Sequence, residues 1–235
     1  MSAYARLRER VLEANLEIVR AGLVVLTFGN VSGADRDAGV MAIKPSGIPY
    51  EHLTEDAIVV VDLASGVVVE GESRPSSDTP THLVLYGAFP VLGGIVHTHS
   101  PYATAWAQAG RELPCLGTTH ADHFDGPVPI TRPLRRAEID GDYERLTGEA
   151  IVEAFAQLDV DPLARPAALV VSHGPFAWGA DVAAAVENAV ALEAVAAAAL
   201  RTESLQPAVE PIGDDLRGRH FRRKHGPAAY YGQQP

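Results

Sequence analysis

The chain has 235 residues, of which 47% are hydrophobic and 21% charged, so its composition excludes disordered, collagen-like and coiled-coil structure for most of its length. Nineteen lysine and arginine residues against thirty aspartate and glutamate residues give a formal net charge of −11, which disfavours binding to nucleic acid or to an acidic membrane surface. Cys115 is the only cysteine, and no stretch resembles a signal peptide or a membrane span. We therefore expect a cytoplasmic protein without disulfides, without a membrane segment and without a cysteine-based metal cluster.

The first third of the chain indicates one helix followed by short strands. Apolar residues at helical spacing between positions 7 and 19 predict a surface helix that ends at Gly22. Runs rich in β-branched residues then predict strands of a mainly antiparallel sheet at 23–27, 40–44, 57–63 and 67–71.

The rest of the chain mixes helices with short strands. Asp78 or Thr79 is a suitable cap for a helix with Pro80 in its first turn, and a long alanine-rich helix is predicted from a cap at Asp181 toward Thr202. No repeat or Gly/Ser linker interrupts the sequence, so we expect one layered α/β domain over residues 1–235. Between those helices we predict strands at 93–100 and 167–173, and helices at 101–110 and about 140–157.

Three histidines are candidates for a metal site. Alternate residues of a strand share a face, so His97 and His99 are expected to project side by side at the end of a predicted strand. His173 follows another apolar strand and precedes Gly174. Three imidazoles with an open fourth position are typical of a catalytic metal ion that acts as a Lewis acid. Hydrogen-bonded histidines at strand ends are the alternative.

Two short segments are candidates for binding an anion such as phosphate. Residues 44–47 offer the ammonium of Lys44, the hydroxyl of Ser46 and the backbone of a tight turn. Ser76 and Ser77 lie at the start of a predicted helix, where free N–H groups and the helix dipole favour negative charge, and Asn30 offers a further amide. An ordinary turn and a capped helix are the alternative. The polar residues at 118–123 and the basic tail are given no role by their pattern, and the tail's basic residues are typical of a solvated face.

Seven motifs resemble the class II aldolase/adducin family in their order and spacing. They are TFGNVS, IKPSG, VVEGESRPSSDTPTH, GGIVHTHS, GTTHAD, SHGPFAWG and RKHGPAAYYG, and the resemblance extends from about residue 7 to Gln233. It implies a single three-layer α/β/α domain with a mainly antiparallel central sheet, assembled as a cyclic (C4) homotetramer with active sites between subunits.

The resemblance also implies roles for individual residues. His97, His99 and His173 would bind a divalent ion, most often zinc in this family, with manganese or cobalt as alternatives. Asp78 would lie close to that ion, at a position where the family's aldolases carry glutamate and its epimerases aspartate. The substrate's phosphate would be held by Asn30 and the two candidate anion-binding segments, through Lys44, Ser46, Gly47, Ser76 and Ser77.

Two further residues match acid/base positions of the family's epimerases. They are Asp122 and Tyr231, the tyrosine reaching over from a neighbouring subunit, so that the tail at about 207–235 would complete that subunit's site. Accessory active-site positions are matched by Thr118, Glu144 and His220.

The activity that the resemblance implies is epimerisation at carbon 4 of a pentulose phosphate. L-Ribulose 5-phosphate and D-xylulose 5-phosphate would interconvert by retro-aldol opening and re-formation of the C3–C4 bond. A family aldolase of the L-fuculose-1-phosphate type, which releases the aldehyde, is the first alternative. A non-catalytic, adducin-like binding module is a remote one, because it need not keep a metal triad.

Overall fold

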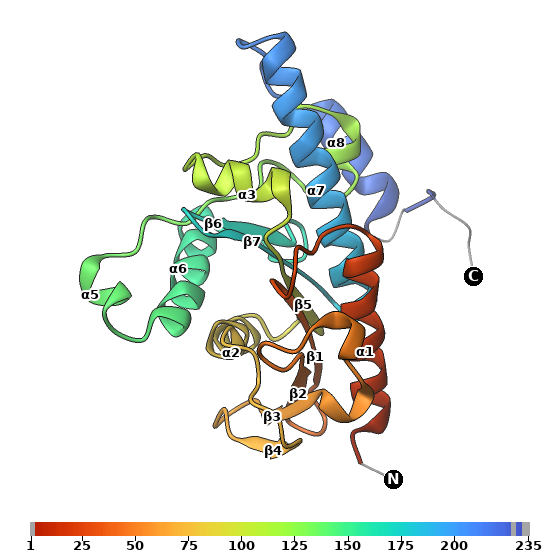
Figure 1. Ribbon diagram of the computed structural model, residues 1–235. Coiled ribbons are helices and arrows are strands. Elements are labelled where there is room, and N and C mark those ends of the chain that lie inside the picture. The colour runs from red at the N-terminus through yellow and green to blue at the C-terminus, as the bar shows by residue number, and fades with distance from the viewer. Residues whose placement is uncertain (1–2, 227–228, 232–235) are drawn as a thin grey trace.

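A single seven-stranded sheet forms the centre of the computed structural model, which describes residues 3–226 and 229–231 (Figure 1). The strand order is β4-β3-β2-β1-β5-β7-β6, and every neighbouring pair of these strands is antiparallel. The strands are β1 (Asn30–Asp35), β2 (Val40–Ile43), β3 (Val59–Asp62), β4 (Val68–Glu70), β5 (Gly94–His97), β6 (Ala167–Val170) and β7 (Gly174–Gly179).

Helices cover both faces of this sheet (Figure 1). α1, α3 and α7 pack on one face, α2 and α6 on the other, and α8 lies against α4 beside α7. The helices are α1 (Ala5–Arg20), α2 (Thr79–Ala88), α3 (Pro101–Gln108), α4 (Thr118–Ala121), α5 (Arg136–Ile139), α6 (Tyr143–Leu158), α7 (Val182–Leu205) and α8 (Asp214–Lys224), with 3-10 turns η1 (Tyr50–His52) and η2 (Glu55–Ala57).

Strict alternation along the strands produces two separate apolar cores. On β3, Val60 faces α1 and α7, whereas Val59 and Val61 face the opposite layer. On β5, Val96 faces α1 and α7, whereas Ile95 faces the opposite layer. The predicted three-layer α/β/α architecture with an antiparallel central sheet is therefore confirmed.

The long helix α7 is the main helix of the layer that it forms with α1 and α3. Its N-terminus is capped by Asp181, whose carboxylate accepts the N–H of Ala184 at 2.8 Å, as the sequence predicted. The helix approaches the sheet closely, because a Cβ on Gly94 would lie 2.6 Å from Cα of Val182. By length and composition α7 could cross a membrane, but 56% of its most apolar window is buried inside the protein, as in the core helix of a folded domain.

The structure corrects several predicted elements. Residues 23–27 form a loop and not a strand, because Leu26 takes a left-handed backbone conformation (φ 55°) and its side chain is 78% exposed. The first strand begins instead at Asn30. The strand β7 and the helix α8 were not predicted, and the predicted strands ending at 100 and 173 end at His97 and Val170.

Candidate metal and phosphate site

One pocket at the edge of the sheet gathers the residues predicted to bind the metal and the phosphate. Because neighbouring strands are antiparallel, the ends of β2 and β5 lie beside the starts of β1 and β7. The pocket at this edge has a volume of about 440 Å³. Its lining includes Glu144 and every residue predicted for the metal or the phosphate: Asn30, Lys44, Ser46, Gly47, Ser76, Ser77, Asp78, His97, His99 and His173.

The three histidines converge within this pocket. Their candidate ligand atoms all lie within 4.8 Å of one another, and Nε2 of His97 is 3.2 Å from Nε2 of His99. We expected alternation along one strand to place His97 and His99 side by side. This expectation is wrong for His99, because β5 ends at His97. His173 lies in the turn between β6 and β7, next to Ser172 with its left-handed backbone (φ 60°). The end of β5, the segment that follows it and the turn between β6 and β7 therefore position the triad.

Two of the three histidine rings contact a further polar group that orients them. The Pro175 carbonyl accepts a hydrogen bond from Nδ1 of His97 at 2.9 Å, which leaves Nε2 free to bind an ion. The Tyr143 hydroxyl lies 3.3 Å from Nδ1 of His173. Sequence analysis missed Tyr143, and its place directly before Glu144 is the one signal that could have indicated it.

The charge states of these groups suit a divalent cation. Burial lowers the pKa of His173 to about 4 and also lowers the pKa of His99, so both imidazoles are neutral at physiological pH. Burial alone would raise the pKa of Asp78, but its electrostatic interactions with His97 and His82 and the hydrogen bond from the Asn30 amide hold it below its usual value. Neutral imidazoles beside an ionised carboxylate are the donor set that such an ion requires.

Asn30 connects the metal side of the pocket with the anion segment. Its amide nitrogen donates to Oδ2 of Asp78 at 2.7 Å and to Oγ of Ser76 at 3.1 Å. Asp78 occupies the N-cap position of α2, but its side chain makes no capping bond and turns toward Asn30 instead. The expected capping role of Asp78 is therefore replaced by a place among the histidines.

The two predicted anion segments lie side by side. Ser46 N–H bonds to the Arg74 carbonyl at 2.9 Å, and Ser76 N–H bonds to the Lys44 carbonyl at 3.0 Å. These two N–H groups are thus committed to holding the segments together. The Lys44 ammonium and the serine hydroxyls remain in the pocket lining as groups that suit an anion.

The other predicted residues form a second group. The carboxylate of Asp122 accepts bonds from Arg223 and from Nδ1 of His220, at 3.1 Å for the histidine. The guanidinium of Arg223 lies 4.5 Å from the centre of the Tyr231 ring. Thr118 begins the short helix α4 that ends beside Asp122, and it lines a smaller cavity of about 270 Å³ between α4 and α7.

This second group does not line the metal pocket of its own chain, as far as the described residues extend. Arg223 was expected to be part of a solvated face, which is wrong, because its side chain binds Asp122. Residues 227–228 and 232–235 of the predicted tail lie outside the described residues.

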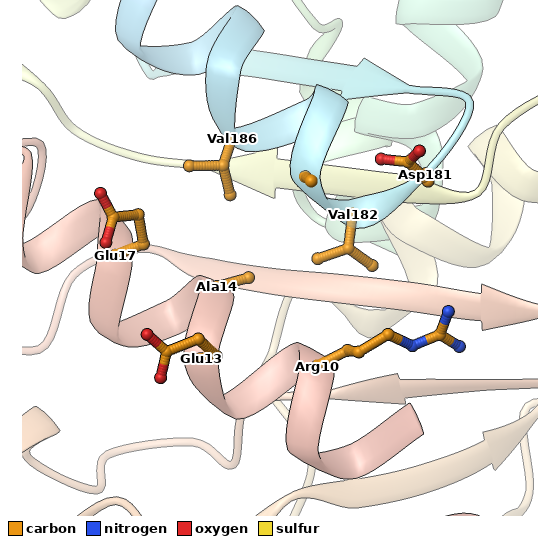
Figure 2. A pocket seen from close by; sticks show the side chains of 8 residues that line it. Arg10, Glu13, Ala14, Glu17, Asp181, Val182 and Val186 are labelled. Atoms are coloured by element: carbon orange, nitrogen blue, oxygen red, sulfur yellow. The ribbon is translucent and has the colours of Figure 1, made fainter. Parts of the chain in front are cut away.

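A larger hollow between α1 and α7 has a different character (Figure 2). It measures about 530 Å³, and Val182 and Val186 of α7 point toward Ala14 of α1 across it. Glu13 and Glu17 stand on its α1 side. Its lining offers no histidine and no convergent set of polar donors, in contrast to the histidine-lined pocket of about 440 Å³.

Comparison with known proteins decides the family. The family model described as "Class II Aldolase and Adducin N-terminal domain" matches residues 9–200. The chain belongs to this family. Members of the class II aldolase family act with a metal ion, and the triad of His97, His99 and His173 is a site that fits one.

Relatives within the family are similar over almost the whole chain. The chain is 54% identical over 229 residues to "L-ribulose-5-phosphate 4-epimerase UlaF" of Salmonella paratyphi B, covering 97% of this chain and 99% of the relative. It is 53% identical over the same length to the protein of that name from Salmonella typhi, with the same coverage. Among solved structures, an L-fuculose 1-phosphate aldolase superposes with a TM-score of 0.78 at 25% identity, covering 95% of this chain and 97% of that one.

Proposed function

We propose that the chain is a metal-dependent L-ribulose-5-phosphate 4-epimerase. The observation that carries the proposal is the pocket in which three histidines, Asp78 and two anion-binding segments meet. The pocket suits a phosphorylated sugar on a metal ion, and the 54% identity to epimerases of that name favours this reaction within the family. The substrate and product would be L-ribulose 5-phosphate and D-xylulose 5-phosphate.

The chemistry requires breaking a carbon–carbon bond. The hydrogen on C4 is not adjacent to the C2 carbonyl and is not acidic, so proton abstraction there cannot invert the centre. In our proposal a base takes the C4 hydroxyl proton, C4 becomes an aldehyde, and the electron pair of the C3–C4 bond passes to the dihydroxyacetone fragment as an enediolate. Glycolaldehyde phosphate then rotates, the bond re-forms on its other face, and the proton returns to the C4 oxygen.

His97, His99 and His173 would hold the divalent ion, with Asp78 beside it. When bound, the ion supplies a Lewis acid for the carbonyl end of the substrate. We propose zinc, because neutral imidazoles suit it, with manganese or cobalt as alternatives. The hydrogen bond from Nδ1 of His97 to the Pro175 carbonyl supports this role, because it holds the ring with Nε2 pointing toward the space between the three histidines.

The phosphate would be retained by the opposite side of the pocket while the aldehyde turns. We assign this grip to the ammonium of Lys44 and to neighbouring hydroxyl, amide and backbone groups. A grip distributed over several groups can hold one end of a fragment while its other end rotates. The groups beside Lys44 are those of Asn30, Ser46, Gly47, Ser76 and Ser77.

We further propose that two copies of the chain complete each site. Asp122 and Tyr231 would be the acid/base pair, with His220 and Thr118 beside them and Glu144 in the metal pocket. Within one chain this pair lies outside the metal pocket, which supports its acting on a neighbour's site. Phe28 lines the pocket with a half-exposed ring, and exposed apolar groups of this kind are typical of an interface.

Several broader features accompany this assignment. Class II aldolases are commonly oligomers, and we propose a cyclic homotetramer in which the tail at 207–235 reaches the next subunit. One domain would span residues 1–235. The similarity to metabolic enzymes supports a cytoplasmic location, with a small sugar phosphate as the partner and with neither nucleic acid nor membrane bound.

An aldolase that releases its aldehyde is the second candidate. The likeness to the L-fuculose 1-phosphate aldolase favours it, because both chains are covered almost completely. Asp78 argues for the epimerase, since the family's aldolases carry the longer glutamate at that position. The two activities differ in whether glycolaldehyde phosphate leaves the pocket.

A coupled assay separates these functions. L-Ribulose 5-phosphate is supplied, and both D-xylulose 5-phosphate and free glycolaldehyde phosphate are measured over time. The proposal predicts the epimer without net release of the aldehyde. Release of the aldehyde would instead establish the aldolase, and a protein inert with every added metal would favour a binding module.

A further inference from the structure

Lys44 occupies an unusual environment for a lysine. Its side chain is buried, with 2% of its surface exposed, and its ammonium donates to the Pro45 carbonyl at 3.3 Å. Among the residues that the structure describes, no carboxylate pairs with it. A buried ammonium group that lines a pocket and has unused hydrogen-bond donors is suited to bind an anion. Another contact must hold the ammonium in place when no anion is bound.

Tyr50 supplies that support from behind the pocket. The Lys44 nitrogen lies 4.6 Å from the centre of the Tyr50 ring, within the range of a cation–π interaction. Tyr50 is itself 5% exposed, because the turn η1 packs it into the core beneath α1. It does not belong to the pocket lining, so it would reach a ligand only through Lys44 or through the backbone.

The hydroxyl of Tyr50 makes a second connection. It donates to the Gly29 carbonyl at 2.8 Å, directly before Asn30. Gly29 has a left-handed backbone (φ +99°), and a Cβ there would lie 2.9 Å from the His97 carbonyl oxygen. The loop fastened by Tyr50 therefore lies against the strand end that carries the first metal-binding histidine.

We infer that Tyr50 is a positioning residue for phosphate recognition: its ring fixes the Lys44 ammonium and its hydroxyl fixes the Gly29 loop at a set distance from it. This inference rests on the proposed function for the identity of the substrate but not for the anion itself. Inorganic phosphate can serve as the probe, because the contacts concern the phosphate end only.

Two variants separate the two contacts. Tyr50→Phe removes the hydroxyl bond and keeps the ring, and Tyr50→Leu removes both while keeping an apolar side chain. Tyr102→Phe is the matched control. The Tyr102 hydroxyl accepts a hydrogen bond from Arg201 at 2.9 Å, and the Arg201 guanidinium lies 5.2 Å from the centre of the Tyr102 ring, outside the pocket.

Phosphate affinity is measured by calorimetry on the zinc-loaded protein, together with zinc affinity, kcat and KM. For Tyr50→Phe we expect the phosphate dissociation constant and KM to rise about 5-fold, because one hydrogen bond is lost, and kcat to stay within about 2-fold of the wild-type value. For Tyr50→Leu we expect a rise of about 20-fold or more, since the cation–π contact is lost as well. Zinc affinity and the Tyr102→Phe variant should match wild type.

The outcomes distinguish the inference from the proposed function. Wild-type phosphate affinity and KM in Tyr50→Phe and Tyr50→Leu would overturn the inference, as would equal losses of kcat and thermal stability without a change in phosphate affinity. Should Tyr50→Leu fail to fold, Tyr50→Phe decides alone. Weakened phosphate binding in a protein that does not epimerise L-ribulose 5-phosphate would reject the epimerase and keep the role of Tyr50.

Discussion

Arg223 donates to both carboxylate oxygens of Asp122, at 2.8 and 2.5 Å, although the two residues are 101 positions apart. The bond joins α8 to the end of α4, and His220 of the same helix adds a third bond. Burial alone would raise the pKa of Asp122, but Arg223 and His220 lower it below its usual value. The proposed acid/base carboxylate is therefore kept ionised and oriented by its own chain's last helix.

Arg223→Lys tests this relationship while keeping the positive charge. Lysine cannot bind a carboxylate with two parallel bonds, so Asp122 loses orientation and its pKa rises toward the ordinary value. We expect kcat to fall by about 10-fold with KM within about 2-fold. The measurement is kcat and KM for epimerisation, with Arg222→Lys as the control. An unchanged kcat would show that Arg223 only fastens the helix.

Mixing two inactive variants tests whether sites are shared between chains. His97→Asn disables the metal pocket, and Tyr231→Phe disables the proposed acid/base group. If each site takes these residues from different copies, co-expressed mixtures contain intact sites and should recover roughly one quarter of wild-type activity at equal amounts. A site built within one chain would predict no recovery, because no chain carries both intact residues.

Much of the site was predictable because its residues come from short, ordered motifs. Lys44, Ser46 and Gly47 follow a strand, and His97 ends one, so the antiparallel sheet brings these motifs to one edge. The loop at 23–27 was not predictable in this way, because its apolar residues imitate a strand although Leu26 is exposed.

Long-range contacts account for most of what sequence analysis missed. A stretch as polar and basic as residues 217–224 gives no sign that Arg223 binds Asp122, since that bond depends on how α8 packs. The strand β7 was hidden by Gly174 and Pro175, which are typical of turns but here begin a fully buried strand.

Tyr143→Phe should weaken metal binding without touching a ligand. The hydroxyl lies 3.3 Å from Nδ1 of His173, and partners of this kind fix the ring and tautomer of a metal-binding histidine. We expect zinc affinity to fall by about 10-fold, measured by competition with a chelator on the apoprotein. Rescue of activity by excess zinc would support this role, whereas unchanged affinity would limit Tyr143 to lining the pocket.

His120 predicts a pH dependence of stability. It is buried, donates from Nε2 to the Gly126 carbonyl at 2.8 Å, and burial lowers its pKa to about 4. Between pH 6.5 and 4 the unfolded chain binds a proton at this residue that the folded chain does not, so the free energy of unfolding falls as pH falls through that window.

Replacing His120 by glutamine keeps a donor and removes the titration. The slope of unfolding free energy against pH in that window should become shallower by up to about 1.4 kcal/mol per pH unit, the value for one proton. Urea unfolding of the metal-free protein at pH 4.5, 5.5, 6.5 and 7.5 measures it. Identical slopes in the two proteins would contradict the buried, neutral state of His120.

Metal titration of the apoprotein tests most directly the central claim that His97, His99 and His173 hold the ion on which epimerisation depends. Bound zinc and the rate of D-xylulose 5-phosphate formation are measured on the same samples as zinc is added. We expect both to rise together and level off at about one ion per chain, and we expect neither zinc binding nor the epimerisation rate to rise in His97→Asn. A metal-free protein that epimerises as fast as the loaded one would contradict it.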